Sequence, residues 1–560
     1  SLYYNTTGIY NNAFGMEAML NNTSGQYNTA FGGRALCSNT TGSRNSASGY
    51  RALSANTTGS CNIAVGFYAL LANTSGKTNT AVGHSSMQVN TTGYNNTASG
   101  HYSLRWNETG FNNTAIGTVA LYCNSTGHSN TATGFAALNC NTTGCYNTAA
   151  GRCALYYNTT SNYNTAFGMN SLRDNTGSNN TAVGSSALAL NTSGSDNASF
   201  GKFSMVNNTT GASNVAFGAS AMCATTTGSQ NTAIGNIAMR FNTTGSCNTA
   251  SGRYALYNNT GGSRNVALGY KALLSNLTAN YSTAVGTCSL YSNKADYTVG
   301  VGFGALKCNT TGVRNTAVGN AALCVNTTGQ ANTASGYAAL RDNTGSYNTA
   351  SGTYALKVNT TGSNNTASGY NSLKNNTTGT ENSAFGVSSL NSNTTGAANS
   401  AFGWCALTSN STGQQNVAVG LRSLNNNTSG KCNVAVGNYS LQTNSTGLLN
   451  SSLGYQSLQQ NITGCYNTAS GSYALKNNTA TGNTGLGYAA AGSNTTGTGI
   501  VAIGCRALNA STTGNNNVAV GNAAMYCNTS GRCNTAVGTY SLYNNTSGNL
   551  NTGLGYYTLG

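Results

Sequence analysis

Residues 28–44 read Asn-Thr-Ala-Phe-Gly-Gly-Arg-Ala-Leu-Cys-Ser-Asn-Thr-Thr-Gly-Ser-Arg, and variants of this stretch follow one another along the chain. Repeats begin at Asn11, Asn28, Asn45 and onward to Asn551. The 33 starts are separated by 28 intervals of 17 residues and four of 16. We number the positions of a repeat from this Asn and call the residues that share a position a column. The sequence therefore predicts one continuous array over residues 1–560, a window of a longer chain.

The repeat length and composition predict an all-β fold. Seventeen residues are too few for a helical hairpin, and short Thr, Val, Ile and Phe segments between Asn and Gly favour strands joined by tight turns. We expect a parallel β-solenoid (β-roll) of about 33 coils, with strands at positions two to four and near seven to eleven. The final turn is Asn-Thr-Thr-Gly, whose Gly we expect at positive φ. The predicted core is column nine (Leu36, Leu53, Leu70, Leu121), and the predicted bend is column five (Gly32, Gly49, Gly66).

The composition argues against several functional classes. Charged residues are only 5% of the chain and the net charge is +16, which is too dilute for the basic stripe that nucleic acid requires. No stretch approaches 18 consecutive apolar residues, so we expect no membrane span. Seven acids and three histidines are spread along an array that gives them no common site. We therefore predict no catalytic residues, no metal site and no cofactor.

The turn at positions twelve to fifteen has two interpretations. As architecture, its Asn caps the turn and can form a ladder with the Asn of the next coil. As chemistry, Asn-x-Thr/Ser is the acceptor sequence for N-linked glycans. The candidate glycosylation sites are Asn22, Asn39, Asn56, Asn107, Asn276 and Asn461. The architectural interpretation is favoured, and O-linked sugars on the Thr pairs are a further alternative.

The 17 cysteines occupy the variable columns. Cys123 and Cys140 share column eleven of adjacent coils, where their Cα atoms are expected about 5 Å apart, within disulfide range. Cys308 and Cys324 form a weaker pair, at positions eleven and ten of consecutive coils. We predict a candidate disulfide between Cys123 and Cys140.

Small or apolar residues occupy both faces of the expected strands. A coil this narrow has room for few side chains, so we expect one face to fill the coil and the other to pack on a neighbouring chain. The predicted assembly is a homo-oligomer in a multi-chain fibre, with three parallel chains as the expected number.

The motif in Asn231-Thr232-Ala233-Ile234-Gly235-Asn236-Ile237-Ala238 resembles the head repeat of trimeric autotransporter adhesins and related repeats of phage and environmental tail-fibre-like proteins. The resemblance extends over all 33 repeats. It implies left-handed parallel β-rolls in which three chains form a stiff rod on a cell or virion surface. The adhesin unit is shorter, and the Asn-Thr-Thr-Gly turn here resembles an insertion into it.

These observations predict a non-catalytic structural protein that forms an extracellular filament or fibre shaft, with covalent glycans on its turns as an option. The alternative is an adhesin or phage tail-fibre shaft that binds host surface glycans. Ice binding through the Thr residues of column two is a more remote hypothesis, because Val215, Val266, Val417 and Val434 interrupt that column.

Overall fold

The computed structural model describes residues 1–559, which contain 33 strands and no helix. The chain divides into two units, Ser1–Tyr281 and Ser282–Gly560. Each strand is three residues long and occupies positions two to four of its repeat. The predicted all-β parallel solenoid is confirmed within each unit. None of residues 1–559 belongs to a helix long and apolar enough to cross a membrane.

The strands of the first unit are β1 (Asn12–Phe14), β2 (Thr29–Phe31), β3 (Ser46–Ser48), β4 (Ile63–Val65), β5 (Thr80–Val82), β6 (Thr97–Ser99), β7 (Thr114–Ile116), β8 (Thr131–Thr133), β9 (Thr148–Ala150), β10 (Thr165–Phe167), β11 (Thr181–Val183), β12 (Ala198–Phe200), β13 (Val215–Phe217), β14 (Thr232–Ile234), β15 (Thr249–Ser251) and β16 (Val266–Leu268). Those of the second are β17 (Thr283–Val285), β18 (Val299–Val301), β19 (Thr316–Val318), β20 (Thr333–Ser335), β21 (Thr349–Ser351), β22 (Thr366–Ser368), β23 (Ser383–Phe385), β24 (Ser400–Phe402), β25 (Val417–Val419), β26 (Val434–Val436), β27 (Ser451–Leu453), β28 (Thr468–Ser470), β29 (Thr484–Leu486), β30 (Val501–Ile503), β31 (Val518–Val520), β32 (Thr535–Val537) and β33 (Thr552–Leu554).

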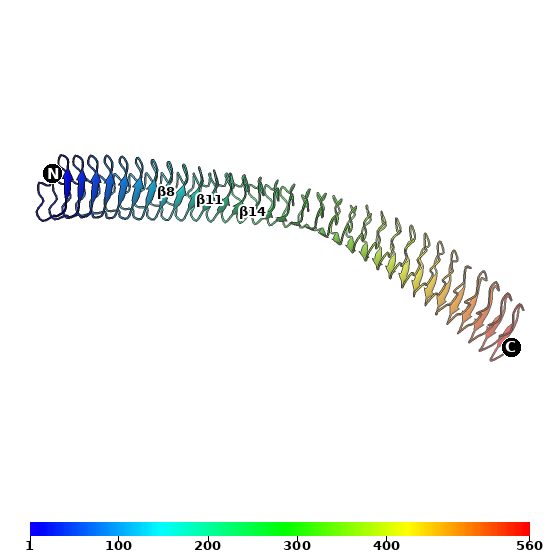
Figure 1. Ribbon diagram of the computed structural model, residues 1–560. Helices are drawn as coiled ribbons and strands as arrows, with labels where there is room; N and C mark the ends of the chain where they lie inside the picture. Colours follow the sequence, from blue (N-terminus) through cyan, green and yellow to red (C-terminus); the bar gives the residue numbers. More distant parts are fainter. Residues whose placement is uncertain (560) are drawn as a thin grey trace. The chain divides into compact units, whose positions relative to one another are not determined.

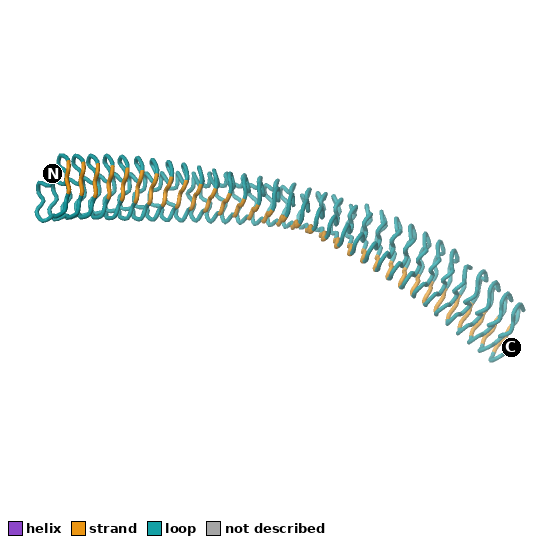
Figure 2. Tube along the Cα trace, in the orientation of Figure 1, coloured by secondary structure: helices purple, strands orange, loops and turns teal. Residues whose placement is uncertain are grey.

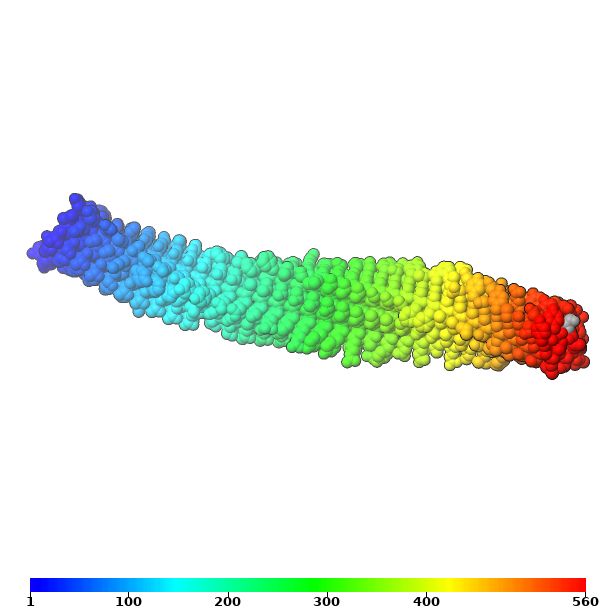
Figure 3. Space-filling view, turned by 90° about the horizontal axis from the view of Figure 1, so that it is seen from below, coloured from blue at the N-terminus to red at the C-terminus, as the bar shows by residue number. Residues whose placement is uncertain are grey.

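Within each unit, successive strands pair in parallel and column by column (Figure 1). Strand β2 pairs with β3 so that Ala30 faces Ala47, and the same register joins β13 to β14 and β25 to β26. The strands of a unit form one narrow band, and turns make up the rest of each coil (Figure 2). On the surface, consecutive coils follow one another as side-by-side bands along each unit (Figure 3).

The interior of a coil is filled by Ala at positions three and eight and Leu or Met at position nine. In the second full coil, Ala30, Ala35 and Leu36 are all buried. The four Leu residues predicted as core, Leu36, Leu53, Leu70 and Leu121, are fully buried. Positions two and four of the strands face outward, so the residue between them is the strand's contribution to the interior.

The prediction of a second strand near positions seven to eleven is wrong, because these residues form turns. Positions seven and nine have left-handed backbones, with φ of 58° at Arg34 and 50° at Leu36. This bend turns Ala35 and Leu36 into the interior together, whereas an extended strand would direct them to opposite faces. Backbone bonds still join the coils here, because the Leu36 amide donates to the Ala52 carbonyl oxygen at 3.0 Å.

Columns five and fifteen are Gly for different physical reasons. Column five has φ near 135°, as at Gly32 (135°), Gly49 (139°) and Gly66 (138°), a region that side chains rarely adopt. The prediction that the turn glycine at position fifteen has a positive φ is wrong. Gly42 is required instead by close approach, since a Cβ there would lie 2.3 Å from the carbonyl oxygen of Gly59 in the next coil.

Candidate functional site

The asparagines of column twelve form a ladder inside the solenoid. The Nδ2 of Asn39 donates to Oδ1 of Asn22 in the preceding coil at 2.7 Å and to the Gly42 carbonyl oxygen of its own turn at 2.9 Å. The same pair of bonds recurs at Asn56. One amide group thus closes its own turn and joins it to the coil before, which explains why this column is almost always Asn.

The six candidate glycosylation residues all belong to this ladder. Asn22, Asn39, Asn56, Asn107, Asn276 and Asn461 are fully buried. In each, both N–H groups of the side-chain amide are used, as at Asn107, whose Nδ2 donates to Asn90 Oδ1 at 2.7 Å and to the Gly110 carbonyl at 2.9 Å. An N-linked sugar would replace one of these N–H groups. The folded coil therefore favours the architectural interpretation of the turn, and glycosylation stays a prediction.

A second ladder follows column one. The backbone N–H of Asn45 donates to Oδ1 of Asn28 at 2.9 Å, and its Nδ2 donates to the carbonyl oxygen of Gly59 at 2.9 Å. These bonds join the start of one strand to the turn of its own coil and to the coil before it. The interior therefore contains hydrogen-bonded amides beside the Leu and Ala columns, and these amides have the partners that buried polar groups require.

Two residues that replace Asn interrupt the column-twelve ladder. Thr225 and Ser511 are fully buried, and their hydroxyl oxygens have no hydrogen-bond partner. The acceptors that each should reach, Oδ1 of Asn208 and Oδ1 of Asn494, also lack a partner. The hydroxyl side chains are too short to reach the preceding coil, so each replacement leaves one donor and one acceptor unsatisfied.

The candidate disulfide residues Cys123 and Cys140 are both thiols in the structure and are partly buried. Burial raises the pKa of Cys123 above its ordinary value. Burial also raises the pKa of Cys140, and the neighbouring Cys123 adds to that rise. The two thiols therefore lie close enough to interact, and the bond between them stays a prediction.

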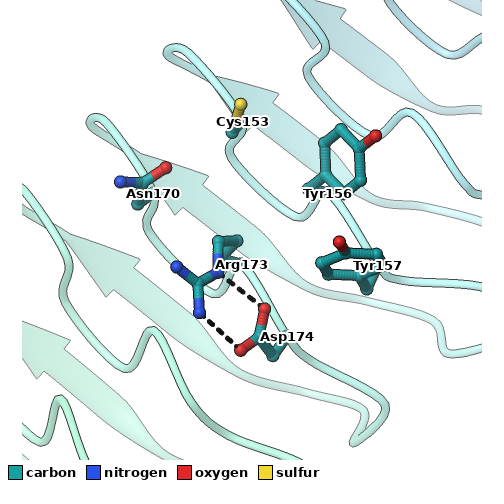
Figure 4. Close-up of a pocket in the computed structure, with 6 residues that line it drawn as sticks. All are labelled: Cys153, Tyr156, Tyr157, Asn170, Arg173 and Asp174. Atoms are coloured by element: carbon teal, nitrogen blue, oxygen red, sulfur yellow. Dashed lines mark hydrogen bonds and ion pairs between the residues drawn. The ribbon is translucent and has the colours of Figure 1, made fainter.

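A shallow pocket of about 440 Å³ lies on the outer surface of the first unit, between two adjacent coils (Figure 4). Cys153, Tyr156 and Tyr157 come from one coil, and Asn170, Arg173 and Asp174 come from the next.

The Arg173 guanidinium is held in a fixed orientation inside this pocket. Its Nε and one terminal nitrogen donate to the two carboxylate oxygens of Asp174, each at 2.7 Å. The bond to Asp174 raises the pKa of Arg173 above its ordinary value. The ring centroids of Tyr156 and Tyr157 are 4.6 Å apart, edge to face. The pocket combines an oriented ion pair, two phenol rings and an amide, groups that suit binding of a polar ligand.

Sequence reasoning missed this ion pair, although a signal exists. The heptapeptide Leu-Arg-Asp-Asn-Thr-Gly-Ser occurs at 172–178 and again at 340–346, and each copy contains a shortened turn, Asn-Thr-Gly, directly after the Arg-Asp pair. In the second copy Arg341 makes the same two bonds to Asp342, at 2.8 and 2.7 Å. The identical motif therefore places the same ion pair in both units.

No protein-family model and no curated protein matches this chain. Across residues 1–559, no group of three or more His, Cys, Asp or Glu side chains is arranged to hold a metal ion. The resemblance to adhesin and tail-fibre repeats thus rests on the repeat motif and on the regular β-solenoid that the motif forms.

Proposed function

We propose that this chain is a non-catalytic structural protein, the solenoid shaft of an extracellular filament or fibre at a cell or virion surface. The observation that carries the proposal is the interior of each unit, where the same Leu and Asn columns continue from coil to coil. A stack held by ladders along its axis transmits force along that axis, because successive coils within each unit are bonded to one another. The resemblance to fibre-forming repeat proteins supports the same conclusion.

Column four supports lateral packing into a multi-chain fibre. Its Phe, Val, Ile and Leu side chains project outward from the strands, and many are exposed, including Phe31, Phe217, Ile234 and Leu453. Neighbouring rings also stack, with Phe385 and Phe402 centroids 5.0 Å apart at 5°. An apolar stripe of this kind on a chain with few charges favours association with further copies, three in the expected assembly.

Light scattering combined with electron microscopy tests the shaft and its assembly. We expect the full chain to form elongated particles with the mass of three chains, and Phe385→Ser with Phe402→Ser to reduce the assembled fraction. The matched control is Phe303→Ser, an exposed ring of column six in the same unit. Compact monomers of the wild-type chain would contradict the proposal, as would equal effects of the column-four and control variants.

The cellular location has its own test. An antibody raised against the chain should label intact source cells or virions from outside without permeabilisation. Labelling that requires permeabilised cells would contradict the extracellular assignment.

A further inference from the structure

Seven coils differ from the rest in the same three ways. They carry Ser in column four, Tyr at position six or seven, and Lys or Arg at position six, seven or ten; they begin at Asn45, Asn96, Asn248, Asn332, Asn348, Asn365 and Asn467. These are all the coils with Ser in column four. Among the other coils, only the one that begins at Asn265 combines such a Tyr with such a cation. We call the seven the Ser–Tyr–cation coils.

Three of these coils are consecutive and form one surface cluster in the second unit. Tyr337, Tyr354 and Tyr370 follow one another, with ring centroids 5.3 Å apart for the first pair and 6.4 Å for the second. The outer rings, Tyr337 and Tyr370, are 48% and 50% exposed. In the same three coils column four is Ser335, Ser351 and Ser368, so the apolar stripe proposed to contact other chains is interrupted here.

The two lysines of this cluster lie over one aromatic ring, that of Tyr354. The Nζ of Lys357 lies 4.8 Å from the centroid of the Tyr354 ring, and the Nζ of Lys374 lies 5.6 Å from the same centroid. The carboxylate in the cluster, Asp342, already binds Arg341. No ion pair among residues 1–559 includes Lys357 or Lys374. Two fixed positive charges on adjacent coils are therefore left to an external anion.

We propose that the coils beginning at Asn332, Asn348 and Asn365 bind a linear anionic polysaccharide that lies along the solenoid axis. Lys357 and Lys374 contact its carboxylate or sulfate groups on successive sugars. The half-exposed rings of Tyr337 and Tyr370 lie against the apolar faces of the sugar rings, and the Ser hydroxyls bond to sugar hydroxyls.

Three features favour this class of ligand. The rung spacing of about 4.8 Å in a parallel sheet is close to the length of one sugar in an extended polysaccharide, so equivalent groups meet on each coil. Ser and Tyr hydroxyls are both donors and acceptors, as sugar hydroxyls require. Single-stranded nucleic acid is less well matched, because it stacks successive bases on aromatic platforms, whereas Tyr337 and Tyr354 are inclined at 78°.

The binding site goes beyond the proposed structural function and does not depend on it, because binding is measured on the soluble full chain whether or not it assembles. Isothermal titration at low ionic strength compares heparin as the sulfated polymer, polygalacturonate as the carboxylated polymer, dextran as the neutral one, and oligo(dT). We expect binding to at least one anionic polysaccharide and none to dextran. Tighter binding of heparin would identify sulfate as the anionic group that is recognised, and tighter binding of polygalacturonate would identify carboxylate.

Variants locate the site. Lys357→Gln with Lys374→Gln should weaken binding by about tenfold or more, since two charge-assisted contacts are lost. Tyr337→Ala with Tyr370→Ala should also weaken binding at unchanged net charge. The control Lys431→Gln with Arg532→Gln removes two charges from column sixteen of the same unit and should leave the affinity within about twofold.

Three results would overturn the proposal. The first is no binding of the wild-type chain to either anionic polysaccharide. The second is an equal loss in the control variant, which would mean attraction by net charge alone. The third is binding of oligo(dT) as tight as that of the polysaccharides with the same dependence on Lys357 and Lys374.

Discussion

At the scale of the residue, the least expected feature is the left-handed backbone of the core Leu. Every coil places its position-nine residue near φ of 50°, as at Leu53 and Leu70. This conformation costs an L-residue about 1–2 kcal/mol, whereas complete burial of a Leu side chain contributes about 1.5–3 kcal/mol. Burial therefore offsets the backbone cost, and Gly, which avoids that cost, would leave the interior empty.

Replacement of the turn glycine tests the close approach of adjacent coils. In Gly42→Ala the new Cβ would lie 2.3 Å from Gly59 O and 2.5 Å from Asn39 Oδ1, so both ladder partners must move. We expect a local loss of about 3 kcal/mol or more, measured as faster amide hydrogen exchange in the two coils. Gly33→Ala is the control, because the nearest atom to its Cβ would be in the Tyr50 ring, at 3.4 Å, an ordinary contact distance. Equal exchange in the two variants would contradict this explanation.

Restoring an Asn to the column-twelve ladder should stabilise the coils around it. Thr225→Asn supplies the amide that Asn208 Oδ1 lacks and removes a buried hydroxyl without a partner. We expect a gain of about 1 kcal/mol or more, seen as slower hydrogen exchange at the amides of this turn. Thr227→Asn, at the exposed position of the same turn, should leave the exchange rates of these amides unchanged. Unchanged exchange in Thr225→Asn would show that the missing bonds carry no stability.

The partly buried thiols of Cys123 and Cys140 should react slowly with alkylating reagents. Burial raises the pKa of Cys123 and Cys140 above the ordinary 9.0, so both carry less thiolate at pH 8 than a thiol of ordinary pKa. Their rates should rise as the pH increases past 9.0, and deprotonation over that same range should reduce the stability of the fold. Mass spectrometry of iodoacetamide-treated chain measures the rates, with urea-unfolded chain as control. Equal alkylation rates of Cys123 and Cys140 in the native chain and in the urea-unfolded chain would contradict the prediction.

At the scale of the element, the coil shows what sequence can and cannot predict. The Ala between two outward residues at positions two to four is a period-two signal, and the structure has a strand there. Positions eight and nine, Ala35 and Leu36 for example, also look like part of a strand. The left-handed backbones at positions seven and nine cannot be foreseen, because Gly occupies position seven in one coil alone, at Gly304, and position nine in none of the coils. The Arg173–Asp174 pair is visible in the sequence only when the acid is considered together with its adjacent Arg.

The shortened coils explain most other gaps in the ladder. Oδ1 of Asn326 and Oδ1 of Asn461 have no partner, and in each case the next coil of the same unit has a 16-residue repeat. In the coil that follows Asn326, Asn343 donates only to its own turn, to the Gly345 carbonyl at 2.8 Å. Loss of one turn residue keeps the strand register but draws the Asn side chain away from the coil before.

An insertion tests this explanation. Adding one Thr after Thr344 restores the 17-residue repeat, and the Asn343 amide should then reach Asn326 Oδ1. We expect slower hydrogen exchange in the turns of both coils, by roughly 1 kcal/mol. The control insertion after Thr361, in a turn that is already complete, should destabilise its coil. Destabilisation by both insertions to the same degree would reject the explanation.

At the scale of the whole molecule, the intact mass decides whether the turns carry sugars. Because the column-twelve amides are buried in the ladder, we expect native material to have the mass of the bare chain, 56.8 kDa, before and after enzymatic removal of N-linked glycans. A higher mass that falls on this treatment would show that the amides are modified before the coils close. A higher mass that falls only under β-elimination would locate the sugars on Thr or Ser.

The amide ladder also has a direction. Where the ladder is unbroken, each column-twelve Nδ2 donates toward the coil that precedes it in sequence, as Asn39 does to Asn22 and Asn56 to Asn39. A completed coil therefore presents a bare oxygen acceptor to the repeat that follows. A chain that leaves a ribosome or an export channel with its N-terminus first meets a finished template at every step, and each repeat needs only the one already laid down. The solenoid can therefore fold coil by coil from its N-terminus while the chain is still emerging, before its C-terminal repeats are available.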